Sequence, residues 1–224
     1  MGFARELGKI LWFYSRRIYY SLDICLKDIW RLAEDRLWDA RLGIHTCYDD
    51  KDLEERALFK DEVIYRPTSY HRIRKMLEYL RPGPEDVLVD YGSGKGRVVA
   101  MAVRERLKKV IGVELKRSLC GTARRNLERL KGKQTPAEVV CMDAVDFNPD
   151  EATVIFLYDP FKYRTFIRVI DNIRENLLSR PRKIRIAYFD ERYAEILDAQ
   201  EWLKREGEIG HTRIFVWTSK KVPG

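Results

Sequence analysis

The chain has 224 residues with 45% hydrophobic side chains, enough for one α/β domain and an additional element. Charged residues make up 35% of the chain but are mixed in sign, which argues against intrinsic disorder. The net charge of +8 favours acidic partners such as nucleic acid, anionic lipid or an acidic protein, and it is equally typical of an ordinary basic surface.

Cysteine and histidine usage bears on the compartment and on metal binding. The four cysteines are Cys25, Cys47, Cys120 and Cys141. None forms a C-x-x-C pair, and a chain of this length needs no disulfides for stability, so we expect reduced thiols in a cytoplasmic protein. Three histidines without an H-x-x-x-H spacing argue against a histidine-rich metal site, and we expect no metal.

The first sixty residues are predicted to form a helical extension, separate from an α/β domain over residues 61–224. Apolar residues recur at three- and four-residue steps through about residue 29, and a second helical stretch over residues 29–42 ends at Gly43. The apolar run at residues 10–14 is far shorter than the ~20 residues of a membrane span, so we expect no transmembrane segment. A basic, aromatic helix here could contact a membrane surface, cover a site, form a dimer interface or pack within the protein.

From about residue 65, short apolar runs alternate with helical patterns. The predicted strands are residues 87–91, 110–113, 138–142, 154–158, 184–189 and 213–217. The predicted helices are residues 70–80, 97–107, 117–130, 163–178 and 192–206. This alternation is typical of a doubly wound, mostly parallel sheet. We expect seven strands, with an antiparallel last strand because only a short polar link, residues 207–212, precedes it.

A glycine-rich turn follows the first predicted strand. Gly92, Gly94 and Gly96 stand between this strand and the next helix, where glycine allows the backbone to approach a ligand. The glycine spacing is two and two, whereas the NAD fingerprint has two and three. Asp90, at the strand end, would repel a pyrophosphate and attract an ammonium group. S-adenosylmethionine (AdoMet) carries an ammonium and a sulfonium and no phosphate, so we disfavour an NAD-dependent dehydrogenase.

Residues 90–96, Asp-Tyr-Gly-Ser-Gly-Lys-Gly, resemble motif I of the class I AdoMet-dependent methyltransferases. The resemblance implies the fold of that family and AdoMet as the cofactor. It also implies that five residues of this segment surround the methionine part of AdoMet. These are Asp90, Gly92, Ser93, Gly94 and Gly96.

Two further strands end in acids, which agrees with this interpretation. Glu114 follows Asp90 by 24 residues, and a carboxylate there can accept two hydrogen bonds from a ribose diol. The resemblance assigns Glu114 to the ribose. It implies that Asp143, at the end of the third strand, accepts from the adenine amino group and that Ala144 lines the ring pocket. Each acid alone would be an ordinary solvated strand end.

The fourth predicted strand runs into Asp159, Pro160 and Phe161. Ligands of doubly wound sheets lie beyond the carboxyl ends of the strands, so these residues would face the transferred methyl group. They resemble the Asp/Asn-Pro-Pro-aromatic motif IV of amine-methylating enzymes, with one proline missing. The resemblance implies a catalytic role in which an oxygen orients the acceptor amine and the ring shelters it. The alternative is a simple strand-terminating turn.

Residues 65–70, Tyr-Arg-Pro-Thr-Ser-Tyr, precede the helix before motif I. Thr68 or Ser69 would make a suitable N-cap for that helix. Alternatively, the segment closes over the cofactor, with Tyr70 in contact. A similar stretch precedes motif I in the histone-lysine methyltransferases that lack a SET domain, and the likeness spans roughly residues 62–161. It implies a protein amine of the lysine type as the methyl acceptor.

Two alternatives for the function remain. Residues 104–133 and 162–185 are rich in lysine and arginine, which suits an RNA acceptor, although no RNA-binding module accompanies them. The protein could also be a scaffold that binds AdoMet without turnover.

Overall fold

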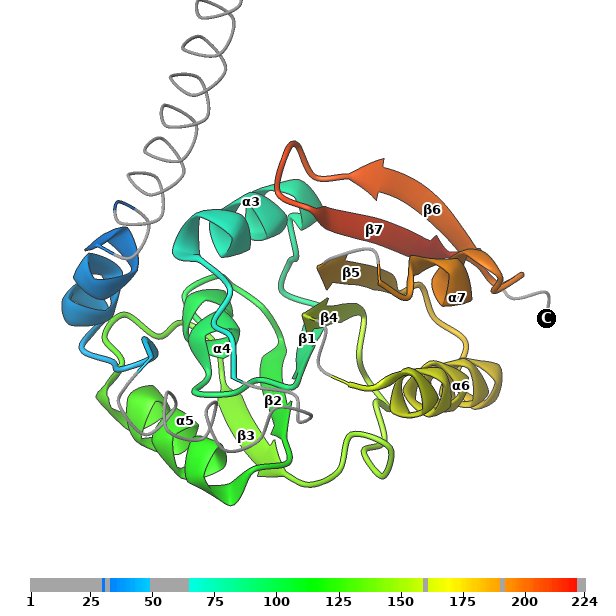
Figure 1. Ribbon diagram of the computed structural model, residues 1–224. Coiled ribbons are helices and arrows are strands. Elements are labelled where there is room, and N and C mark those ends of the chain that lie inside the picture. The colour runs from blue at the N-terminus through cyan, green and yellow to red at the C-terminus, as the bar shows by residue number, and fades with distance from the viewer. Residues whose placement is uncertain (1–29, 31–32, 49–64, 159–160, 190–191, 221–224) are drawn as a thin grey trace, which may run out of the picture. The chain divides into compact units, whose positions relative to one another are not determined.

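The computed structural model describes residues 30, 33–48, 65–158, 161–189 and 192–220 (Figure 1). The chain divides into two compact units, Met1–Trp38 and Asp39–Gly224. Residues 33–42 are helical. The amphipathic helix expected over the first 29 residues, with its suggested membrane contact, lies outside the described residues. The second unit contains the sheet.

Seven strands form a single sheet in the order β3-β2-β1-β4-β5-β7-β6. β1 to β5 are parallel, whereas β7 is antiparallel to both β5 and β6. The predicted mostly parallel sheet with an antiparallel last strand is therefore confirmed. The strands are β1 (Val87–Tyr91), β2 (Lys109–Glu114), β3 (Ala137–Cys141), β4 (Val154–Tyr158), β5 (Arg185–Phe189), β6 (Leu203–Glu208) and β7 (Ile214–Ser219).

Helices cover both faces of the sheet (Figure 1). α4 and α5 contact β1, β2 and β3, while the buried side of α6 packs in the main core with Val89 and Ile155. Apolar side chains therefore point both ways from the central strands, which explains why β1 is buried along its whole length. The helices are α3 (Tyr70–Leu80), α4 (Arg97–Ala102), α5 (Arg117–Arg129), α6 (Tyr163–Ser179) and α7 (Ala194–Asp198).

The helix predicted over residues 192–206 is wrong for most of its length. Only α7 is helical, and the segment continues into β6, an edge strand whose residues after Leu203 are mostly exposed. The apolar residues of this segment were interpreted as helical because β6 lacks the alternating apolar pattern that would indicate a strand. Its backbone is instead held by the ladder with β7, a long-range pairing that local periodicity cannot indicate.

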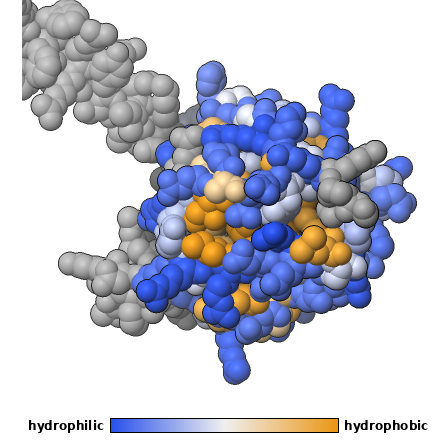
Figure 2. Space-filling model, turned by 90° about the vertical axis from the view of Figure 1, so that its right-hand side faces the viewer, coloured by the Kyte–Doolittle hydropathy of each residue, from blue (hydrophilic) through white to orange (hydrophobic). Residues whose placement is uncertain are grey.

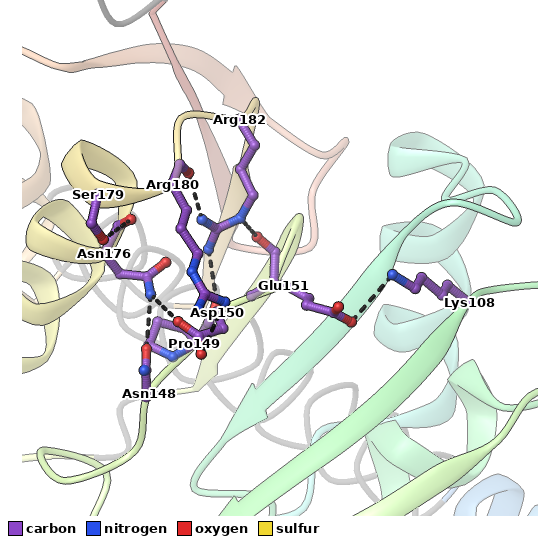
Figure 3. Close-up of polar contacts among 10 residues, drawn as sticks. Lys108, Asn148, Pro149, Asp150, Glu151, Asn176, Ser179, Arg180 and Arg182 are labelled. Carbon is purple, nitrogen blue, oxygen red and sulfur yellow. Dashed lines mark hydrogen bonds and ion pairs between the residues drawn. The ribbon is translucent and has the colours of Figure 1, made fainter.

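The amino end of β4, opposite the crevice described below, is fixed to α6 by a polar cluster (Figure 3). Asn176 Nδ2 of α6 donates to Asn148 Oδ1 and to Asp150 Oδ1, both at 2.8 Å. Arg180 pairs with Asp150 at 3.1 Å, and Arg182 donates to two backbone carbonyls of the same loop at 2.7 and 2.8 Å. These contacts position the helix that follows β4.

The surface carries scattered apolar residues. The face shown in Figure 2 is mostly hydrophilic, with hydrophobic residues gathered near its middle. No helix within the described ranges combines the length and apolarity that a bilayer span needs. Cys47, Cys120 and Cys141 form no disulfide in this part of the chain.

The strand order reverses between β1 and β4. The chain leaves β1 toward one side of the sheet and leaves β4 toward the other, so the two loops diverge at the carboxyl ends. Such a switch point creates a crevice in which ligands of doubly wound sheets bind. The glycine turn follows β1 at this edge.

Candidate functional site

A cavity of about 670 Å³ opens at the carboxyl ends of β1, β2 and β4. It brings together most of the residues that the sequence singled out. Those that line it are Asp90, Gly92, Ser93, Gly94, Glu114, Asp143, Ala144 and Phe161. Gly96 and Tyr70 are not among the lining residues, and Asp159 and Pro160 lie outside the described residues.

Asp90 lies at the base of the cavity, where it is only 3% exposed. It stands opposite Gly112 of β2 and Phe156 of β4 in the sheet register. Burial, together with the nearby charge of Glu114, raises the pKa of Asp90 to about 8. A cationic ligand group would stabilise the ionised carboxylate, whereas a phosphate would be repelled by it.

Gly94, at the centre of the glycine turn, leaves room for the ring of Tyr65 because it has no side chain. Its φ is +55°, and a Cβ there would lie 2.3 Å from Cε2 of the Tyr65 ring. Tyr65 therefore lies directly against the turn, and its hydroxyl donates to Thr46 O at 2.6 Å. The turn itself is held to β2, because the amides of Gly92 and Ser93 donate to Val113 O at 2.8 and 3.0 Å.

Gly96 serves helix packing rather than the cavity. Its φ is +81°, and a Cβ there would lie 3.1 Å from the Cβ of Ala123 in α5. The third glycine of the motif thus allows the start of α4 to lie close to α5.

We expect Gly96→Ala to destabilise the fold more than Gly132→Ala. Both glycines have positive φ, +81° and +74°, but a Cβ at Gly132 meets nothing within 4 Å. Placing alanine in a left-handed backbone conformation costs about 1–2 kcal/mol of folding stability at either site. Only Gly96→Ala also crowds a neighbouring side chain, which costs roughly 1 kcal/mol more. Urea denaturation would measure both, and equal losses would show that the close approach to Ala123 is unimportant.

Glu114 braces the glycine turn, a role that the sequence analysis missed. Its Oε2 accepts from the amide of Gly94 at 2.8 Å, and its Oε1 accepts from the amide of Lys116 at 2.9 Å. Each carboxylate oxygen can still accept another hydrogen bond. Glu114 can therefore hold the turn and receive two donors from a ligand at once.

The end of β3 contributes a slot that is apolar on its inner side. Ala144 is buried, Asp143 is exposed, and Met142, Leu115 and Leu119 line the cavity beside them. Asp143 Oδ1 accepts from the amide of Val145 at 3.0 Å, which fixes the turn after β3. A flat apolar ring with an amino group at its edge would suit this slot.

The other end of the cavity is aromatic and basic. Phe156, Tyr158, Phe161 and Tyr193 line it together with Lys162 and Arg192. Phe161 contacts Tyr91 edge to face, with ring centres 6.3 Å apart. This end lies beyond β4, where the acceptor was expected.

Tyr70, expected at the cofactor, is completely buried at the start of α3. Its hydroxyl donates to Asp39, and the Arg97 guanidinium lies 4.7 Å from its ring centre. Ser69 occupies the N-cap position of α3 but makes no side-chain capping bond. Four other residues of the segment that was expected to close over the cofactor, residues 65–68, line the cavity in its place. Arg97 also lines it, and the sequence analysis gave Arg97 no role.

The lining residues fit AdoMet better than a dinucleotide. Two carboxylates, Asp90 and Glu114, face the space where a pyrophosphate would have to lie. The Ser93 Oγ is buried beside Gly112 of β2 without a hydrogen-bond partner among the described residues, whereas the Ser93 amide holds the turn to β2. The thin turn at Gly94 and the slot beside Ala144 complete the match to the methionine and adenine ends.

Comparisons with known sequences point in the same direction. The family model described as histone methylation protein DOT1 matches residues 45–135. A protein-lysine N-methyltransferase of Saccharolobus islandicus (strain REY15A) is 31% identical over 97 residues. That alignment covers 43% of this chain and 60% of the relative, so the chain spans less than two thirds of the relative's length.

Solved structures show the same fold. An RNA methyltransferase from Salinibacter ruber, in complex with S-adenosylhomocysteine, superposes with a TM-score of 0.50 at 24% identity, covering 70% of this chain and 97% of that one. A TehB-like SAM-dependent methyltransferase from Corynebacterium glutamicum also has a TM-score of 0.50, at 16% identity over 77% of this chain and 95% of that one. At these identities the likeness concerns the fold alone.

Proposed function

The chain has the class I, Rossmann-like methyltransferase fold, and on that basis we propose that it is an AdoMet-dependent methyltransferase acting on an amine nitrogen of a protein, with a lysine-type side chain as acceptor. The observation that carries the proposal is the cavity at the switch point, where three strand-end acids and a glycine turn converge. A cytoplasmic location is part of this proposal, because Cys47, Cys120 and Cys141 form no disulfide within the described residues.

Each end of the cavity has a role in the proposal. Asp90 would pair with the ligand ammonium, Glu114 would accept from the ribose diol, and Asp143 would accept from the adenine amino group beside Ala144. Bound AdoMet would supply a methyl carbon activated by a cationic sulfur. The protein residues then have to align an acceptor and exclude water, which requires no fixed triad.

The acceptor assignment has two supports. The sequence relative is a protein-lysine N-methyltransferase, and the matching family model concerns histone methylation. Independently, Tyr158, Phe161 and Tyr193 line the acceptor end, and aromatic faces stabilise a cationic amine by cation–π attraction. A base is needed only when the amine arrives protonated, and Asp159 is the carboxylate next in sequence after β4.

The first experiment is a calorimetric titration with S-adenosylhomocysteine, the expected product. Saturable one-to-one binding, followed by transfer of labelled methyl groups into the protein fraction of a cell extract, is the expected result. A folded protein that does not bind would contradict the proposal. Binding without turnover on any fraction would instead favour a scaffold role.

Asp159→Ala separates acceptor chemistry from cofactor binding. We expect the variant to bind S-adenosylhomocysteine within about twofold of the wild type, while methyl transfer falls by roughly 10–100-fold because an orienting acceptor oxygen is lost. Parallel titration and labelled-transfer assays would measure both. Normal transfer by this variant would place the acceptor elsewhere.

RNA is the second candidate acceptor, because the basic segments over residues 104–133 and 162–185 could contact phosphates. Label in the RNA fraction, with binding that weakens steeply as salt rises, would establish it in place of a protein acceptor.

A further inference from the structure

A short segment ahead of the predicted α/β domain is bound to the glycine turn. Lys95 Nζ donates to Cys47 O at 3.2 Å, and His45 N donates to Asn126 Oδ1 at 2.9 Å. Asn126 Nδ2 of α5 donates in turn to His45 O at 3.0 Å and to Lys95 O at 2.9 Å. The buried amide side chain of Asn126 therefore joins the backbone of His45 to the backbone of the turn.

Arg97 lines the cavity and places a positive charge there, although the residue is only 2% exposed. Its Nε donates to Thr46 Oγ1 at 2.7 Å, and its two terminal nitrogens donate to Thr68 O at 3.1 Å and to Cys47 Sγ at 3.3 Å. Stacking on Tyr70 orients the guanidinium further. Residues 65–68 line one part of the cavity and are called the Tyr65–Thr68 lip. Arg97 thus links the start of α4 to this lip through Thr68.

Asp39 supplies the negative charge for this arrangement, although it is only 5% exposed and 58 residues from Arg97 in the sequence. Its Oδ1 accepts from Thr46 Oγ1 at 2.6 Å and from the Tyr70 hydroxyl, and its Oδ2 accepts from the Cys47 amide at 2.9 Å. Burial opposes ionisation, but the hydrogen bonds from Thr46 and Tyr70 outweigh it and lower the pKa of Asp39.

We propose that Asp39, Thr46 and Arg97 form a positioning triad that holds the Tyr65–Thr68 lip against the glycine turn and thereby sets cofactor affinity. Thr46 is its centre, because its hydroxyl donates to Asp39 and accepts from Arg97. The ligand-binding consequence rests on the proposed function. All three residues belong to the compact unit that begins at Asp39.

Thr46→Val and Thr46→Ser form a matched pair for the test. Valine has nearly the shape of threonine and removes both hydrogen bonds, whereas serine keeps them. We expect Thr46→Val to bind S-adenosylhomocysteine about tenfold more weakly, the size of one lost hydrogen bond to a charged group, and Thr46→Ser to bind like the wild type. Should Thr46→Val fail to fold, Asp39→Asn, which keeps the side-chain size, is expected to weaken binding severalfold.

Hydrogen exchange of the ligand-free protein provides a readout that does not need the cofactor. Peptides covering residues 65–70 should exchange faster in Thr46→Val than in Thr46→Ser, while peptides from β6 and β7 should not change. Equal affinity and equal exchange in the two variants would overturn the triad. If the wild type fails to bind S-adenosylhomocysteine, the proposed function is wrong, and the exchange rates still decide whether the triad positions the lip.

Discussion

Gly94→Ala is expected to weaken S-adenosylhomocysteine binding by roughly 100-fold or more, measured by calorimetry. The added Cβ would lie 2.3 and 2.6 Å from Cε2 and Cδ2 of the Tyr65 ring, well inside van der Waals contact. Either the ring must swing away, breaking its hydrogen bond to Thr46 O, or the turn must move into the cavity. Both movements change the wall that would contact the methionine end of the ligand.

Gly210→Ala is the matched control for this prediction. Gly210 has the same φ of +55°, and a Cβ there meets nothing within 4 Å, so it carries the backbone strain without the collision. It should lose stability and keep its affinity. Adding Tyr65→Ala to Gly94→Ala removes the collision and should restore part of the binding. Failure of that double variant to recover, with both variants folded, would place the effect in the backbone of the turn.

Asp90→Asn is expected to abolish measurable binding and to stabilise the ligand-free protein at alkaline pH. The folded-state pKa of Asp90 is raised from 3.8 to about 8, so folding favours the protonated acid. The stability that this group contributes is fully present below about pH 4 and is lost as the pH rises through about 8. Asparagine stays neutral throughout. The variant should therefore gain at least 1 kcal/mol at pH 8.5, about 2–4 °C in Tm for a chain of this size.

Thermal melts at pH 5 and pH 8.5 measure this gain, which should widen with pH. The same pKa predicts the pH dependence of binding. A ligand ammonium favours ionised Asp90, so binding releases a proton, and the affinity of the wild type should rise from pH 6 to pH 7.5. An affinity that is flat over this range, or an asparagine variant that binds normally, would show that Asp90 does not pair with the ammonium. Asp86→Asn, near the amino end of β1, is a control outside the cavity lining.

The sequence by itself determined the central sheet and the position of the cavity. Continuous apolar runs are local signals, and β1 and β4 have the predicted limits. Because parallel strands end at one edge of the sheet, the acids at the carboxyl ends of β1, β2 and β3 had to lie near one another once the strands were placed. Their individual contacts with a cofactor stay predictions.

Only the tertiary structure decided the features that depend on long-range contacts. β6 is a strand because β7 lies beside it, since its own residues carry no apolar alternation. Glu114 braces Gly94 across twenty residues, and Tyr70 turns its hydroxyl away from the cavity to reach Asp39. An arginine directly after the glycine turn would ordinarily be exposed. Arg97 is buried instead, because Thr46, Thr68 and Cys47 accept hydrogen bonds from its guanidinium. A buried charge needs hydrogen-bond partners. Here the partners come from segments distant in the sequence, and no local sequence pattern indicates that these segments lie together.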